Sequence, residues 1–240
     1  MKIIIFTLSF LMSLSSLARK PLKVNFFLGT STSSVYKGAF TWKGKALMLG
    51  PGLVFFDKFS LNGPSLSYSH FQRGQSHSLR ASIRYFDDEE PMIKLDDTKR
   101  SFRNSRPDSV PVSVAYRYKF GFRNKFYIGA RVEKDIAEYK GSSYELHIGT
   151  PLVPFTSLNI VQAYSSSQSN KYYYGHEASS GASFTKVGIG LFIPFIPFDG
   201  KMQASFDKYI INQGSSRHAN LVRGAYNNDV AVLRFFWQIY

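Results

Sequence analysis

The sequence predicts a membrane-spanning antiparallel β-barrel, and three observations lead to that fold class. Apolar and polar residues alternate with a period of two in short segments separated by turn-forming residues. After the N-terminal apolar run, no stretch approaches the length of a helical span, so any membrane insertion must use strands. Aromatic residues make up 16% of the chain although its mean hydropathy is only −0.17, as expected when one face of each strand meets lipid.

The N-terminus has the pattern of a secretory signal peptide. Met1-Lys2 is a short positive start, Ile3 to Leu14 is apolar, and Ser16-Leu17-Ala18 presents small residues where a signal peptidase reads. This apolar run is too short to anchor the chain, because a helix needs ~20 residues to cross a bilayer. We therefore expect residues 1–18 to be a signal peptide cleaved after Ala18, and residues 19–240 to form one barrel domain.

Period-two segments can be followed in order along the chain. Residues 46–56 are interrupted by Gly-Pro-Gly, and residues 59–71 place serines on one face against Leu, Tyr and His. Residues 78–86, 110–120 and 126–133 alternate apolar residues with Arg, Lys, Ser or Glu. The complete set of segments is 24–29, 46–56, 59–71, 78–86, 110–120, 126–133, 144–149, 158–164, 185–195, 201–209 and 230–240.

This set contains an odd number of strands, whereas a single-chain bacterial barrel normally has an even number. We expect the missing strand between Ser31 and Lys45, where residues 38–43 are the best candidate. The prediction is an all-β, single-domain transmembrane barrel of about 12 strands, with 10 as the alternative. Both termini then lie in the periplasm, and the longer polar connections after Asp87, Glu138, Ser165 and Asn212 form outer loops.

The terminal segment predicts how the barrel closes. Its apolar face is assigned to lipid and comprises Leu233, Phe235, Trp237 and Ile239 with Ala231. Arg234 and Gln238 are assigned to the lumen, together with Phe236, which we expect to pack over a small neighbour such as Gly29. The alternative register is shifted by one residue and turns Arg234, Phe236, Gln238 and Tyr240 outward.

Basic residues recur on the faces opposite the apolar stripes. An Arg that faces lipid near the bilayer midplane costs ~2–4 kcal/mol, so these side chains must point into the barrel. They are Arg80, Arg84, Arg117, Lys119, Arg131 and Arg234. Two interpretations remain open. Either they form an ion-paired interior with Glu133, Glu145 and Asp207, or they line an anion-preferring lumen.

Composition restricts the partners. The chain contains no Cys, so disulfides, thiolate metal sites and N-terminal acylation are all excluded. Its net charge of +14 would suggest nucleic acid in a cytoplasmic protein, but the signal peptide argues against that partner. Outer-membrane lipid and lipopolysaccharide are the expected partners, and the oligomeric state stays open.

Several stretches resemble the MipA/OmpV family of outer-membrane proteins, which is named after an MltA-interacting scaffold protein. They are Tyr36-Lys37-Gly38, Phe59 to Tyr68, Asp87 to Leu95, Asn170 to Gly175 with Ala178 to Ala182, and Lys208-Tyr209. The sequence departs from the family in its last loop, where Gly214-Ser215-Ser216 replaces Asp-Ser-Pro. The resemblance implies a non-enzymatic barrel in the outer membrane. It also implies a scaffold for peptidoglycan-remodelling enzymes or an envelope structural protein. The alternative function, a small anion-preferring channel, is predicted from the basic residues of the expected lumen.

An outer-membrane acyl hydrolase is a third possibility, and it needs a Ser, a His and an orienting Asn or carboxylate. Ser69 and His70 are adjacent, so they point to opposite faces of a strand, and His77 lies in a turn. None of the five His shows the required trio or a metal-ligand spacing, so we expect no catalytic residue, metal or cofactor. The tyrosines at 172–174 are expected in the interfacial aromatic girdle or folded into the barrel mouth, with the girdle favoured and sugar stacking as the alternative.

Overall fold

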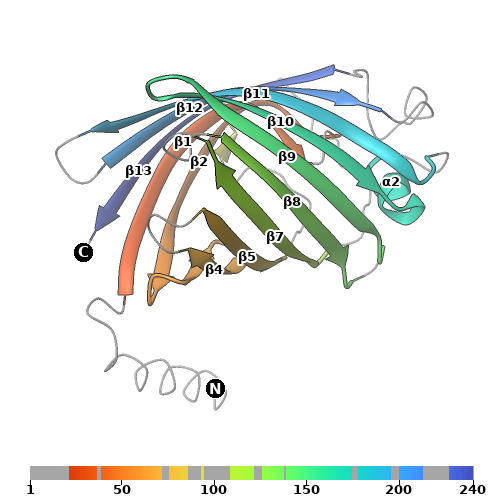
Figure 1. The fold of residues 1–240 in the computed structure, drawn as a ribbon, viewed down its shortest axis with the longest axis horizontal. Helices are drawn as coiled ribbons and strands as arrows, with labels where there is room; N and C mark the ends of the chain where they lie inside the picture. Colours follow the sequence, from red (N-terminus) through yellow and green to blue (C-terminus); the bar gives the residue numbers. More distant parts are fainter. Residues whose placement is uncertain are drawn as a thin grey trace, which may run out of the picture.

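The computed structural model shows a closed antiparallel β-barrel (Figure 1). The structure describes residues 22–36, 39–71, 76–85, 93–94, 109–121, 126–137, 139–174, 178–195, 200–212 and 227–239. Its sheet contains thirteen strands, one of which (β6) is a two-residue piece that pairs only with part of β2. The other twelve form the ring, as the sequence predicts. The signal peptide expected at residues 1–18 lies outside the described residues.

The strands follow one another around the ring in chain order. They are β1 (Leu22–Tyr36), β2 (Ala39–Phe55), β3 (Phe59–Asn62), β4 (Ser65–Phe71), β5 (His77–Arg84), β6 (Ile93–Lys94), β7 (Pro111–Phe120), β8 (Phe126–Asp135), β9 (Ser142–Val153), β10 (Thr156–Ser165), β11 (Gly181–Phe195), β12 (Gly200–Ile211) and β13 (Asn227–Ile239). The ring closes because β1 pairs with β2 on one side and with β13 on the other.

The strand that the sequence count missed lies within residues 59–71 and not at residues 38–43. Gly63 and Pro64 form a tight turn that splits this segment into β3 and β4, and Gly63 adopts a positive φ of 52°. Outward positions change from odd to even numbers across the turn, because Leu61 pairs with Leu66. The sequence analysis did not recognise this change in the alternation of apolar residues, and so counted β3 and β4 as one strand. Residues 39–43 instead extend β2.

A short helix, α2 (Ser167–Tyr174), occupies the connection between β10 and β11. The sequence shows no helical period there, because the segment is polar and short. Figure 1 shows α2 at one end of the barrel, beside the ends of β10 and β11. No helix among the described residues is long and apolar enough to cross a membrane.

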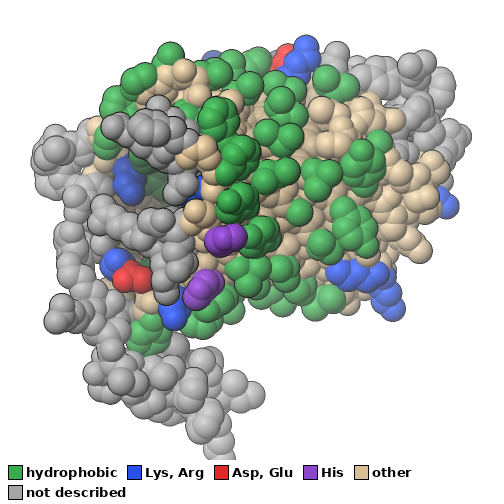
Figure 2. All heavy atoms as spheres, in the orientation of Figure 1, with side chains coloured by type: hydrophobic (Ala, Val, Ile, Leu, Met, Phe, Trp, Pro, Cys, Tyr) green, Lys and Arg blue, Asp and Glu red, His purple; other side chains and the backbone are tan. Residues whose placement is uncertain are grey.

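The outside of the barrel is apolar. Tyr144, Leu146 and Ile148 alternate along β9 and are 53%, 54% and 56% exposed. Figure 2 shows hydrophobic side chains spread over the face that β7, β8 and β9 form in Figure 1. In water this surface would aggregate, whereas in a bilayer it is satisfied by lipid.

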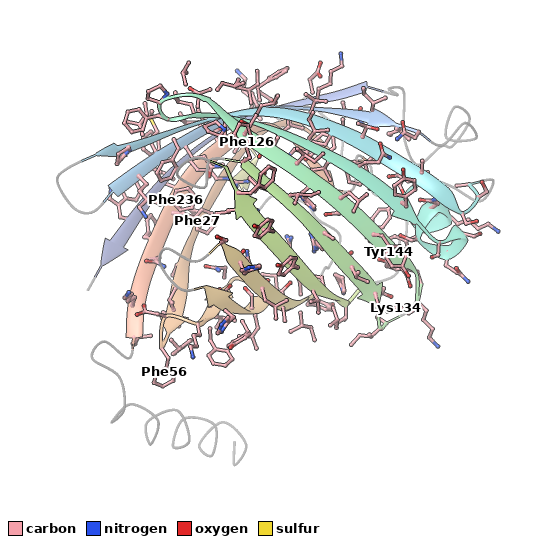
Figure 3. All side chains as sticks on the ribbon, in the orientation of Figure 1. Phe27, Phe56, Phe126, Lys134, Tyr144 and Phe236 are labelled. Atoms are coloured by element: carbon pink, nitrogen blue, oxygen red, sulfur yellow. The ribbon has the colours of Figure 1, made fainter. Side chains whose placement is uncertain are left out.

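Aromatic side chains border this apolar surface at both ends of the strands. At the end with short turns they are Phe59, Tyr68, Tyr118, Phe120, Phe126 and Phe155, and at the end with long connections they are Tyr85, Tyr144 and Tyr164. Figure 3 marks the two ends of β8 with Phe126 and Lys134. Two aromatic belts around an apolar band are typical of a barrel that spans a membrane.

A bulge between β10 and β11 illustrates how the sheet keeps its backbone satisfied at an irregular point. Gln162 lies on the outer face there, and its Nε2 donates to the carbonyl oxygens of Ala163 and Phe184 at 3.2 and 3.3 Å. Thr185 Oγ1 donates in turn to Gln162 Oε1 at 2.7 Å. These side-chain hydrogen bonds satisfy two backbone carbonyl groups at the bulge, on the lipid-facing side of the sheet.

Candidate functional site

The candidate site is the inner face of β5, β7 and β8. Successive side chains of a strand point to opposite faces, and directly opposite residues on paired strands share a face. Arg80 lies opposite Ala115, and Ala115 lies opposite Arg131. Ser78 lies opposite Arg117 in the same way. The residues between them on β5 and β7 are the exposed apolar residues of the outer face, so these arginines share the inner face.

A cavity of about 500 Å³ lies against this face. Its lining combines four arginines and a histidine with five serines, and none of the described residues that line it is acidic. The basic residues are Arg80, Arg84, Arg117, Arg131 and His147. A guanidinium group carries five N–H donors and no acceptor, so the charged part of this lining can only donate hydrogen bonds.

Arg80 and Arg117 carry charges that no described carboxylate balances. Arg80 Nη2 donates to Ser67 Oγ at 2.9 Å, which is a neutral partner. The guanidinium carbon of Arg117 lies 4.4 Å from the centre of the Tyr127 ring, also a neutral partner. Among the described residues, no carboxylate lies within 4.0 Å of either guanidinium. Arg80 is also close enough to Arg117 and Arg131 for the like charges to repel one another.

Arg131, by contrast, is held by two carboxylates. Its Nη2 donates to Glu133 Oε2 at 2.5 Å, and its Nη1 lies 3.9 Å from Glu145 Oε2. The Glu133 side chain is only 2% exposed, whereas the Arg131 side chain is 32% exposed, so the carboxylate is the buried member of the pair. His147 Nε2 lies 3.1 Å from the same Glu145 oxygen. Arg131 therefore belongs to an ion-paired part of the wall, as the first interpretation of the sequence expects.

A second ion pair lies on β11 and β12. Lys186 Nζ is 3.1 Å from Asp207 Oδ1, and it also lies 5.5 Å from the centre of the Tyr209 ring. Gly188 makes room for this carboxylate, because a β-carbon at Gly188 would lie 2.0 Å from Asp207 Oδ1. Asp207 is thus paired with Lys186, a residue that the sequence did not single out.

The remaining basic residues of the prediction lie apart from the cavity. Lys119 is opposite Tyr127, beyond Arg117 on β7, and is not among the cavity-lining residues. Arg234 lies on β13, opposite Gln203 and Gly29. The structure therefore brings together Arg80, Arg84, Arg117 and Arg131, and it leaves Lys119 and Arg234 elsewhere on the wall.

On the terminal strand β13, Leu233, Phe235 and Trp237 share a face with Ala231, which lies opposite Phe206. Phe206 is 52% exposed on the outer surface. The backbone register continues to Ile239, opposite Val24.

The expected contact between Phe236 and Gly29 is wrong. Phe236 lies opposite Phe27, with ring centres 6.5 Å apart, and Figure 3 shows the two side by side on β13 and β1. The register places Gly29 opposite Arg234, because Gly29 lies two positions after Phe27 on an antiparallel strand.

The favoured placement of the tyrosines in the interfacial girdle is wrong for Tyr173 and Tyr174, which are folded inward on α2. Tyr173 and Tyr174 are 3% and 1% exposed, and they pack with Ile211 at the end of β12. Tyr172 stacks on Tyr139 at a centroid distance of 4.2 Å. This tyrosine cluster joins α2 to the connection between β8 and β9, so Tyr173 and Tyr174 have no free ring face for a sugar.

The sequence analysis did not single out the serines of the cavity, the aromatic residue Tyr127 or the basic residue Lys186 as functional. The serines are Ser65, Ser69, Ser78, Ser82 and Ser113. The serines of β4 alternate with period two along the sequence, so their shared face could be predicted. Which serines of the neighbouring strands lie beside them depends on the strand register. Among the described residues, no group of three or more His, Asp or Glu side chains is placed to hold a metal ion.

The chain is similar to known proteins in its structure and not in its sequence. No protein-family model matches the chain, and no curated protein sequence matches it. The outer-membrane protein OprD from Pseudomonas aeruginosa is 10% identical, with a TM-score of 0.39 over 90% of this chain, which spans 65% of OprD. The NanC porin is 10% identical, with a TM-score of 0.43 over 91% of this chain and 100% of NanC. An outer-membrane channel from Pseudomonas putida F1 is 11% identical, with a TM-score of 0.40 over 91% of this chain and 95% of that channel.

Proposed function

We propose that this chain is an outer-membrane channel that prefers anions. The observation that carries the proposal is the cavity on the inner face of β5, β7 and β8. Its charged lining residues are Arg80, Arg84, Arg117 and Arg131, and its described lining contains no acidic residue. Rings and clusters of Arg or Lys in a pore select anions, because they lower the electrostatic energy of an anion and raise that of a cation.

The outer membrane is the compartment that fits this architecture. A closed antiparallel barrel with an apolar outer band, aromatic belts and a polar interior is the form that bacterial outer-membrane proteins take. The signal-peptide pattern at residues 1–18 supports export from the cytoplasm. No catalytic residue is part of the proposal.

Current recordings in planar lipid bilayers under a KCl gradient test the proposal. We expect the zero-current potential to have the same sign as the equilibrium potential of chloride. The double variant R80E/R117E places two negative charges in the cavity, and it should move the potential toward potassium or reverse it. Arg131 is unsuitable for this test, because its replacement leaves Glu133 and Glu145 without their cationic partner.

The matched control is K140E. Lys140 is exposed in the connection between β8 and β9, so the charge change is of the same kind but lies outside the cavity. This variant should keep the wild-type potential. Cation preference in the wild-type protein would contradict the proposal. A lack of any conductance, with co-purification of peptidoglycan-remodelling enzymes, would favour the scaffold role implied by the MipA/OmpV resemblance.

A further inference from the structure

We propose that Arg80 and Arg117 form a binding site for a doubly charged oxyanion, such as phosphate or a small phosphomonoester. The inference deepens the proposed function, because it names the class of solute that the same cavity would hold. It starts from the charge balance of the inner wall. Arg131 is balanced by Glu133 and Glu145, whereas Arg80 and Arg117 have only neutral partners among the described residues.

The two unbalanced guanidinium groups repel each other. Arg80 interacts unfavourably with Arg131, whose charge Glu133 and Glu145 balance, and also with Arg117. Arg80 and Arg117 belong to rigid neighbouring strands, so the backbone cannot move them apart without breaking the register between β5 and β7. An anion between them turns this repulsion into two attractions. Two positive charges without a counter-charge among the described residues are matched best by an anion that carries two negative charges.

The contacts that hold each guanidinium also prepare it for a ligand. Arg80 is anchored through Nη2 to Ser67, whose hydroxyl lies 3.0 Å from that of Ser60. Arg117 lies over the ring of Tyr127, and the Tyr127 hydroxyl donates to Asn159 Oδ1. A ring contact leaves the N–H groups at the edge of a guanidinium available. Fixed, planar donors of this kind match the oxygens of phosphate or carboxylate in bidentate fashion, and they lose little entropy on binding.

Serine hydroxyls complete the donor set. Ser69 lies opposite Arg80 on β4, and Ser78 lies opposite Arg117 on β5. Both serines line the cavity. Hydroxyl donors beside guanidinium groups suit an anion with several oxygen atoms, because each oxygen accepts separate hydrogen bonds. A halide offers no such set of directions.

The size of the cavity sets the upper limit of the ligand. Its volume of about 500 Å³ lies within the range of pockets that hold small organic molecules, about 300–1,000 Å³. The cavity therefore has room for an oxyanion that carries a small organic group, and for more than a bare ion.

Isothermal titration of the detergent-solubilised full barrel with inorganic phosphate and with sulfate, at constant chloride, tests the inference. We expect saturable binding of both dianions, and weaker binding of nitrate, a singly charged oxyanion. R80Q and R117Q should each weaken phosphate binding at least about tenfold, because each removes a charge-assisted contact. K140Q is the matched control and should bind like the wild type. Heat-modifiable gel migration shows that each variant is folded.

The pair R80K/R117K separates charge from geometry. It keeps both charges, so anion preference in bilayers should remain, while the loss of the planar fork should weaken phosphate binding several-fold. Phosphate binding no tighter than nitrate, or unchanged in folded R80Q and R117Q, would overturn the inference. Anion-selective current without dianion binding would leave the channel proposal intact and refute this one. Dianion binding without current would leave this inference intact and refute the channel proposal.

Discussion

Gly29 of β1 lies opposite Arg234 of β13 at the seam where the barrel closes. A β-carbon at Gly29 would lie 2.9 Å from Arg234 Cγ and 2.7 Å from the Leu233 carbonyl oxygen. The stem of Arg234 thus passes over the backbone of β1 where a side chain is missing. This close approach explains how a long basic residue fits on the inner face of the strand pair that closes the barrel.

Gly29→Val should destabilise the closed barrel, because the new side chain meets a backbone oxygen that cannot move without disturbing the β1–β13 ladder. Overpacking of this kind costs about 1–3 kcal/mol. The measurement is the urea midpoint of the folded, heat-modifiable band in lipid vesicles. Gly190→Ala is the control, because its nearest contact is the Ser157 hydroxyl at 3.3 Å. Equal midpoints for the two variants would show that the seam tolerates a side chain at Gly29.

Leu233→Arg should impair membrane insertion far more than Val232→Arg. On the register of β13, Leu233 shares the outer face with the exposed Phe206, and Val232 lies opposite Ser31 and Ser205 on the inner face. An Arg on the lipid face near the midplane costs ~2–4 kcal/mol, whereas an inner Arg reaches polar groups. Folding yield into vesicles measures the difference. If Val232→Arg were the more harmful change, the register of the closing strand would be wrong by one residue.

Glu133→Gln should destabilise the barrel by ~1.5–3 kcal/mol, the usual contribution of a hydrogen bond to a charged group. Glu133 is almost fully buried and accepts the 2.5 Å bond from Arg131. The substitution keeps the shape and removes the charge, so the closest described carboxylate of Arg131 becomes Glu145, at 3.9 Å. Unfolding in urea measures this loss. Asp57→Asn is a suitable comparison, because Asp57 pairs with Lys23 at an exposed turn and should contribute little.

Alkaline pH should loosen the tyrosine cluster around α2. Burial raises the pKa of Tyr139, which lies in the connection between β8 and β9 with its hydroxyl 3.4 Å from that of Tyr173. The folded state therefore holds this proton more tightly than the unfolded state, whose tyrosine pKa is about 10. The stabilisation is complete below about pH 10 and is lost as the pH rises through the folded pKa.

Absorbance of tyrosinate during a pH titration of the folded barrel checks this prediction. One late-titrating group of the wild type should be missing in Tyr139→Phe. The wild type should also lose more stability than this variant above about pH 10, and the two should run parallel below it. Ionisation of the same number of tyrosines at the same pH in both proteins would contradict the buried position of Tyr139.

The sequence predicted the barrel because its main signal is local. Alternation with a period of two reports the two faces of a strand wherever the strand pairs, so residues 110–120 and 126–133 closely match β7 and β8. The same signal failed at Gly63, where a tight turn reverses the phase within one apparently continuous segment. It also failed for α2, which is held by contacts of Tyr173 and Tyr174 with distant residues and not by its own periodicity.

The sequence by itself determined the fold class, the approximate strand number and the sets of residues that share a face, since these depend on neighbours within one strand. The tertiary structure decided which charges meet. Arg131 pairs with Glu145 on β9, and Lys186 pairs with Asp207 on β12, whereas Arg80 and Arg117 lie diagonally on paired strands without a described carboxylate partner. Contacts between strands depend on register, and turns and bulges far from the charged residues set that register. Composition and spacing along a single strand carry no record of it.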